Sequence, residues 1–165
     1  MPGNEVSLSE NDLIVSKTDL QSLITYANAE FCNYSCYTLD ELLGQPHNLI
    51  RHEDMPRGVF QLMWEHLKRE EEFFGYIKNR RKDGDYYWTL ANVAPVMSNR
   101  ECIGYISVRR QPKRTALNII EPLYSRMLAV ESRMNREQQA ATSIQLMQQM
   151  FSREHESYAE FILSL

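Results

Sequence analysis

The stretch from residue 73 to residue 109 constrains the fold of this chain more than any other. Its apolar and β-branched residues are spaced as in extended strands, and the dipeptide Asp83-Gly84 interrupts them. An Asp-Gly pair between two such runs is a strong signal for a tight β-hairpin. A second turn at SNREC leads into CIGYISVRR. The stretch therefore predicts three long antiparallel strands.

Two shorter β-branched runs near the N-terminus are expected to join this sheet, at 13–17 and 23–27. Between them and the long hairpin the pattern is helical. Thr38 and Glu41 have the spacing of a capping box, and PRGVFQLMWEHLKREEE predicts an amphipathic helix. Its apolar face consists of Val59, Phe60, Met63, Trp64 and Leu67. We interpret Trp64 as a core residue, and we predict an α+β fold: a five-stranded antiparallel sheet with a hollow on its helical side.

The loop before this helix is the strongest candidate for a ligand site. Pro46 and Pro56 restrict its backbone, and the Arg51 guanidinium offers a fixed fork of donors that suits a phosphate. We predict Asp54 as the N-cap, which would leave free amides of the first helical turn to add to an anion site. The alternative is that Arg51 and Asp54 pair with each other at the surface, where such pairs contribute little.

The hairpin register decides which side chains face the hollow. A two-residue loop places Asn79 opposite Trp88, whereas a three-residue loop, Asp83 to Asp85, places Asn79 opposite Thr89. We favour the second register, because an amide and a hydroxyl beside small side chains suit a flat heterocycle. The alternative is that Asn79 merely tolerates a position near the sheet edge.

The last strand carries a polar set on one face, formed by Tyr105, Ser107 and Arg109. Ile106 and Val108 lie on the other face, where they could contact an output helix. If the polar set points inward, Arg109 reaches the ligand and favours a negative charge on it. The alternative is a solvated arginine at a strand end.

Composition narrows the classes of function. A net charge of -4 and a pI near 5.6 give no electrostatic reason to expect nucleic acid as a partner. No apolar run approaches the roughly 20 residues of a membrane span and no signal peptide is visible, so we expect a cytoplasmic location. Three cysteines without a nearby histidine favour free thiols over zinc or disulfides. No nucleophile and base pair has a recognisable spacing, so an enzyme is the weakest reading.

The chain is expected to divide into an N-terminal arm (1–12), a sensory domain (13–113) and a helical segment (114–165). The last segment predicts one long helix, or two with a bend, because an apolar heptad seam runs almost without interruption to its end. Positions a and d of the seam are Ile120, Leu123, Met127, Val130, Met134, Glu137, Ala141, Ile144, Gln148, Phe151, His155, Tyr158, Ile162 and Leu165. The stripe must pair with another copy, fold back or lie on the sheet, and we favour a homodimer. A seam still running at Leu165 raises the hypothesis that the natural chain continues.

These elements, in this order, resemble the PAS sensory fold. YTLDELLGQPHNLIRHEDMP, GYIKNRRKDGDYYW and GYISVRR look like the PAS domain of bacterial aerotaxis receptors, over roughly residues 14–125. The resemblance implies non-covalent FAD whose redox state, or oxygen, is reported to a downstream chemotaxis signalling domain and its kinase-coupling proteins. A membrane anchor in the full-length protein stays open.

The resemblance also assigns residues to the flavin. It places Asn28, Arg51, His52 and Asp54 in motif positions for the cofactor, and Asn79 and Thr89 where relatives present polar groups to the pyrimidine edge. Phe73 replaces a family tryptophan and supplies an aromatic face. The position of the adduct-forming cysteine of light-sensing relatives holds no cysteine. A haem-binding PAS oxygen sensor with His47 or His52 as axial ligand, and a cofactor-free dimerisation module, are the alternatives.

Overall fold

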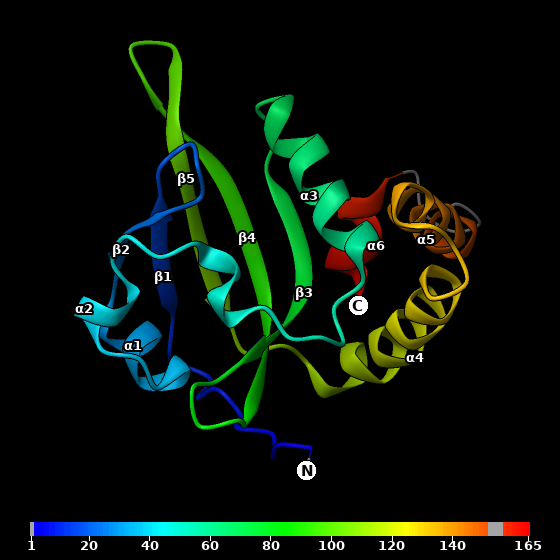
Figure 1. Ribbon diagram of the computed structural model, residues 1–165, viewed down its shortest axis with the longest axis horizontal. Helices are drawn as coiled ribbons and strands as arrows, with labels where there is room; N and C mark the ends of the chain where they lie inside the picture. The colour runs from blue at the N-terminus through cyan, green and yellow to red at the C-terminus, as the bar shows by residue number, and fades with distance from the viewer. Residues whose placement is uncertain (1, 152–156) are drawn as a thin grey trace.

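The computed structural model describes residues 2–151 and 157–165. One antiparallel sheet of five strands forms its centre, in the order β2-β1-β5-β4-β3, which confirms the predicted fold class (Figure 1). The strands are β1 (Ile14–Thr18), β2 (Ile24–Ala27), β3 (Phe73–Arg80), β4 (Tyr86–Ser98) and β5 (Glu101–Arg110). The two N-terminal strands join the sheet beside β5 because β1 pairs with both β2 and β5.

The segment between β2 and β3 covers one face of the sheet with short helices (Figure 1). They are α1 (Ala29–Ser35), α2 (Leu39–Leu42), the 3-10 helix η1 (His47–Ile50) and α3 (Arg57–Lys68). The predicted capping box is present: the Glu41 amide donates to Thr38 Oγ1, and the Thr38 amide donates to Glu41 Oε2. Gly44 follows α2 with a φ of 80°, a conformation that favours glycine and ends the helix.

The register of the long hairpin differs from both predicted registers. Asn79 lies opposite Tyr87, and Ile77 opposite Thr89. The reason is that the Arg81 amide donates to the Asp85 carbonyl at 2.8 Å, so the turn begins one residue earlier than we expected. A shift of two residues leaves every side chain on its predicted face, and Asn79 and Thr89 still share the inner face.

In its described residues the C-terminal segment forms three helices, rather than the one long helix, or two with a bend, that we expected: α4 (Arg114–Glu131), α5 (Arg136–Phe151) and α6 (Tyr158–Ser164). They fold back beside α3 and β3 (Figure 1). Much of the heptad stripe is buried in this packing, including Ile120, Leu123 and Ile144. Folding back was one of the three arrangements considered for the stripe, and a homodimer through it stays a prediction. His155 lies outside the described residues.

The edge of β3 that faces away from β4 is covered by side chains of other elements. Tyr124 Oη of α4 donates to the Tyr76 carbonyl at 2.7 Å, and the Lys78 amide lies 3.2 Å from Met55 Sδ. The Tyr124 ring also lies 6.0 Å from the Trp88 ring, on the outer face. An edge strand engaged in this way cannot pair with a strand of another chain.

Within 2–151 and 157–165, every helix is too short or too polar to cross a bilayer.

Candidate functional site

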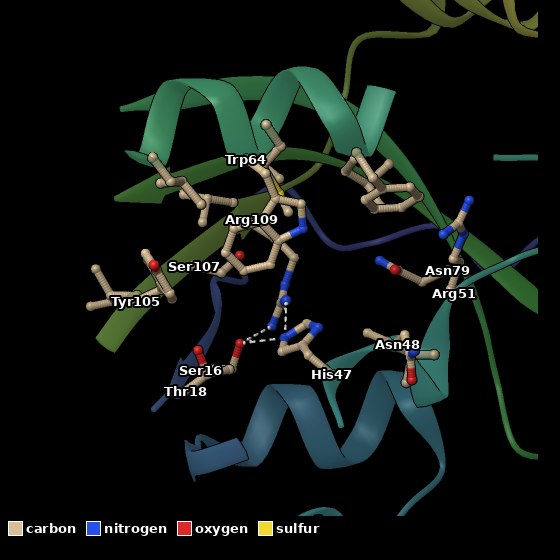
Figure 2. Close-up of a pocket in the computed structure, with 18 residues that line it drawn as sticks. Ser16, Thr18, His47, Asn48, Arg51, Trp64, Asn79, Tyr105, Ser107 and Arg109 are labelled. Atoms are coloured by element: carbon tan, nitrogen blue, oxygen red, sulfur yellow. Dashed lines mark hydrogen bonds between the residues drawn. The ribbon is translucent and has the colours of Figure 1, made fainter. Parts of the chain in front are cut away.

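A cavity of about 240 Å³ lies between the inner face of the sheet, η1 and α3 (Figure 2). Pockets for small molecules usually measure about 300 to 1,000 Å³, so this cavity is compact. The sheet contributes a floor with the small side chain of Ala91 beside Ile77 and Val93. The predicted hollow on the helical side is therefore present, and its interior is not filled by side chains.

Helix α3 forms the apolar wall of the cavity. Phe60, Met63, Trp64 and Leu67 line it, at the spacing of one helical face. The Trp64 ring stands edge-on to the Tyr105 ring, with ring centroids 5.2 Å apart. Our interpretation of Trp64 as a core residue was wrong, because its ring faces the cavity (Figure 2).

Three polar side chains from different elements meet at one end of the cavity (Figure 2). Arg109 of β5, with only 2% of its surface exposed, donates to Ser16 Oγ of β1 at 2.9 Å. Its other terminal nitrogen lies 3.1 Å from His47 Nε2 of η1. The alternative of a solvated Arg109 was therefore wrong. The alternation along β1 carried the signal for Ser16, which we missed.

The protonation of this cluster follows from its donors. A guanidinium can only donate, so His47 Nε2 accepts and the ring is neutral, with its proton on Nδ1. Burial, together with the charge of Arg109, lowers the pKa of His47 to about 3. Burial lowers the pKa of Arg109 to about 10. At neutral pH the cluster therefore holds one buried positive charge, on Arg109.

A second polar group lies elsewhere on the cavity wall. Asn79 is 3% exposed, and among the described residues its Nδ2 has no hydrogen-bond partner. Arg51 lines the same region, and its guanidinium carbon lies over the Phe60 ring, 4.2 Å from the ring centroid. Burial is the main cause that lowers the pKa of Arg51. A buried donor without an acceptor is unfavourable, so the position of Asn79 suits a ligand that supplies an acceptor.

His52 and Asp54 do not line the cavity. Asp54 pairs with Lys78 at 2.6 Å rather than with Arg51, and its amide donates to His52 Nδ1 at 3.0 Å. Burial, and then the charge of Lys78, lowers the pKa of His52. The N-cap prediction for Asp54 was wrong: Pro56 occupies that position and α3 begins at Arg57.

Phe73 and Thr89 share the inner face but are not among the residues that line the cavity. The Phe73 ring stacks on the Tyr158 ring of α6, with centroids 5.6 Å apart and planes 18° apart. Thr89 is fully buried, and its hydroxyl donates to the Ile77 carbonyl at 3.4 Å. The Phe73 ring and the Thr89 hydroxyl therefore both contact other groups of the protein rather than the cavity.

Asn28 is the N-cap of α1 and ties that helix to β1. Its Oδ1 accepts from the amides of Phe31 and Val15, both at 3.0 Å, and its Nδ2 donates to the Leu13 carbonyl at 2.8 Å. All of these contacts are with the backbone of the chain itself. Asn28 therefore positions β1 and α1 rather than lining the cavity.

We expect Asn28→Ala to lower the free energy of unfolding by about 1–3 kcal/mol, because it removes a helix cap and three hydrogen bonds. Urea denaturation followed by circular dichroism measures the change. Asn28→Ser is the matched control, since serine keeps a capping oxygen and should recover part of the loss. An unchanged unfolding midpoint for Asn28→Ala would contradict this assignment.

The histidines considered as haem ligands have other partners. His47 Nε2 accepts from Arg109, and His52 lies outside the cavity lining. In the part of the chain that the structure describes, no group of three or more His, Cys, Asp or Glu side chains could hold a metal ion. The donors around the cavity suit a ligand with hydrogen-bond acceptors and negative charge.

The sequence of the chain is similar to a known protein family and to known receptor and regulatory proteins. A family profile described as the PAS fold matches residues 24–109. The aerotaxis receptor of Escherichia coli K12 is 46% identical over 122 residues, covering 74% of this chain and 24% of the receptor. A nitrogen fixation regulatory protein of Klebsiella pneumoniae is 31% identical over 104 residues, covering 62% of this chain and 21% of the regulator. The chain thus spans about a quarter or less of the length of these relatives.

Solved structures show the same fold. A light-oxygen-voltage domain studied with a flavin analogue superposes with a TM-score of 0.58 at 20% identity, covering 66% of this chain and 82% of that chain. The light state of the aureochrome1 light-oxygen-voltage domain gives 0.58 at 18% identity, covering 67% and 88%. At these identities the likeness shows a shared fold alone.

Proposed function

The chain belongs to the PAS fold family, and from this premise we propose that it is a redox sensor domain that binds FAD non-covalently. The single observation that carries the proposal is Asn79 Nδ2, which has no hydrogen-bond partner in the described part of the chain and lines a cavity that also holds the cation of Arg109. A flavin ring offers acceptors to such donors and gains negative charge on reduction. The 46% identical relative is an aerotaxis receptor, which supports a sensory role.

Five residues of the cavity would hold the cofactor. Asn79 would donate to the polar edge of the ring, and Arg51 would neutralise phosphate charge. Phe60 and Trp64 would pack against flat ring surfaces, in place of the stacking contact expected of Phe73. Arg109 would place its charge near the reacting part of the ring.

The remaining predicted residues would act through others. Asn28 positions β1, and Thr89 holds the β3 backbone. Asp54 binds Lys78, a neighbour of Asn79 on β3, and His52 supports the turn that carries Asp54. These contacts would fix the strands and the loop that border the site without touching the cofactor.

Bound flavin would supply reversible uptake of electrons and a proton. The fixed positive charge of Arg109 would stabilise the negative charge that the flavin gains on reduction. His47 is neutral, so it would hold the guanidinium in place without itself attracting that negative charge. We infer that the signal passes to a chemotaxis signalling module downstream and its kinase-coupling proteins, since the related receptor is about four times as long as the matched region.

The absorption spectrum of protein purified without added cofactor tests the proposal. We expect flavin bands at about 450 nm, and heat should release FAD, because no residue is proposed to bind it covalently. A Soret band would instead identify haem. Colourless protein that takes up no FAD on titration would contradict the proposed function.

A further inference from the structure

Helix α3 separates the cavity from the C-terminal helices. Phe60 and Trp64 line the cavity, whereas Val59 and Leu62 are buried in a cluster with residues of α4, α5 and α6. Helix α5 lies along α3 on the side away from the sheet (Figure 1). A displacement of α3 would therefore change both surfaces.

A buried carboxylate ties α3 to this C-terminal segment. Glu131, the last residue of α4, is 5% exposed. Its two oxygens accept from the amides of Arg57 at 3.1 Å and Gly58 at 3.0 Å, and Ser143 Oγ of α5 donates to it at 2.6 Å. The N-cap residue Pro56 makes no side-chain cap of its own. Glu131 thus occupies the end of α3 where free amides favour negative charge.

The backbones of α3 and α5 approach closely at the same point. A Cβ at Gly58 would lie 2.2 Å from Ser143 Oγ and 3.1 Å from the Ala140 carbonyl oxygen. Even a methyl group would push α5 away or turn the Ser143 hydroxyl from Glu131. Contact between α3 and α5 therefore depends on glycine at this position.

The stripe buried by this packing is the heptad seam. Ile120, Met127 and Ile144 are buried here, and a helix pair between two copies would need the same side chains. The two arrangements exclude each other. Met134 belongs to the seam but is 37% exposed in the folded-back form, so only a pair between copies would bury it.

We propose that Glu131 is a latch between these two arrangements. With the contact made, helices α4, α5 and α6 fold back on α3 and β3 and the chain is a monomer. With the contact broken, the seam is released and pairs with the seam of a second copy, and this released form is the homodimer expected from the sequence. The latch rests on Glu131, Ser143 and Gly58 and does not depend on the proposed flavin.

Two variants of the full chain break the latch in different ways. Glu131→Ala removes the buried carboxylate, whereas Gly58→Ala removes no polar group but pushes α5 away or turns the Ser143 hydroxyl from Glu131. We expect each to raise amide hydrogen exchange in α5 and α6 by about tenfold or more, because buried donors lose their acceptor or the helices separate. Light scattering should show a dimer for both variants and a monomer for the wild type. Glu121→Gln, an exposed glutamate of the same helix, is the matched control and should behave as wild type.

Adding Met134→Lys to Glu131→Ala separates release from pairing. A lysine there is exposed in the folded-back form but falls within the seam of a helix pair, so the double variant should exchange fast and be monomeric. Unchanged exchange in both latch variants would overturn the proposal. A wild-type dimer, a released variant that stays monomeric, or a dimer that survives Met134→Lys would each overturn it as well.

Discussion

Arg109→Gln is expected to lower the midpoint potential of bound flavin by tens of millivolts. Arg109 is 2% exposed and carries the one buried charge of its cluster, so its field is weakly screened by solvent. Two unit charges about 6 Å apart at an effective dielectric constant of about 20 interact by about 3 kcal/mol. For a two-electron couple this corresponds to about 60 mV. Redox titration followed by absorbance measures the shift.

Arg109→Lys is the control for this prediction, because lysine keeps the charge while losing the fork that reaches both Ser16 and His47. Its midpoint potential should remain closer to that of the wild type than that of Arg109→Gln. If glutamine leaves the potential unchanged while flavin stays bound, the electrostatic role of Arg109 is wrong. If both variants fail to bind flavin, the fork rather than the charge is the essential feature.

The second large effect concerns acid. The pKa of His47 is about 3 in the folded protein, against about 6.5 when it is exposed. Between these values the unfolded chain binds a proton that the folded chain does not. The free energy of unfolding should therefore fall as the pH decreases, by about 1.4 kcal/mol for each pH unit below about 6.5. The contribution of His47 is complete above pH 6.5 and is lost progressively on acidification.

His47→Gln tests this assignment. Glutamine offers an amide oxygen to Arg109 but does not titrate, so urea denaturation at pH 6.5, 5.5 and 4.5 should show a shallower dependence than in the wild type. The difference in slope should approach one proton. Equal slopes for the two proteins would show that His47 takes up its proton as readily in the folded state as in the unfolded chain, and the lowered pKa assigned to it would then be wrong.

The sheet could be predicted because its signals are local. Asp83-Gly84 and the period of two along the strands lie within short stretches of sequence. The register could not, since one backbone hydrogen bond between Arg81 and Asp85 moves the start of the turn by a residue. The faces were still correct, because a shift of two residues leaves side chains on the same side.

The site was only partly predictable because its contacts are distant in sequence. Arg109 was proposed from alternation along one strand, but Ser16 and His47 reach it from 93 and 62 residues away. The cap of α3 comes from Glu131, 73 residues beyond Gly58, so a local pattern pointed to Asp54 instead. Trp64 was misassigned because a helix covered on both sides has two apolar faces, and sequence alone does not tell which face borders a cavity.

The covering of β3 bears on where the chain can be shortened. Tyr124 closes the Tyr76 carbonyl, and its ring lies beside Trp88, so the strand depends on α4 for its shielding. A fragment ended at residue 113 would keep every strand yet expose an aromatic surface and an open backbone edge, which invites association in register with other copies. The minimal unit that behaves as a well-folded body therefore extends at least through α4.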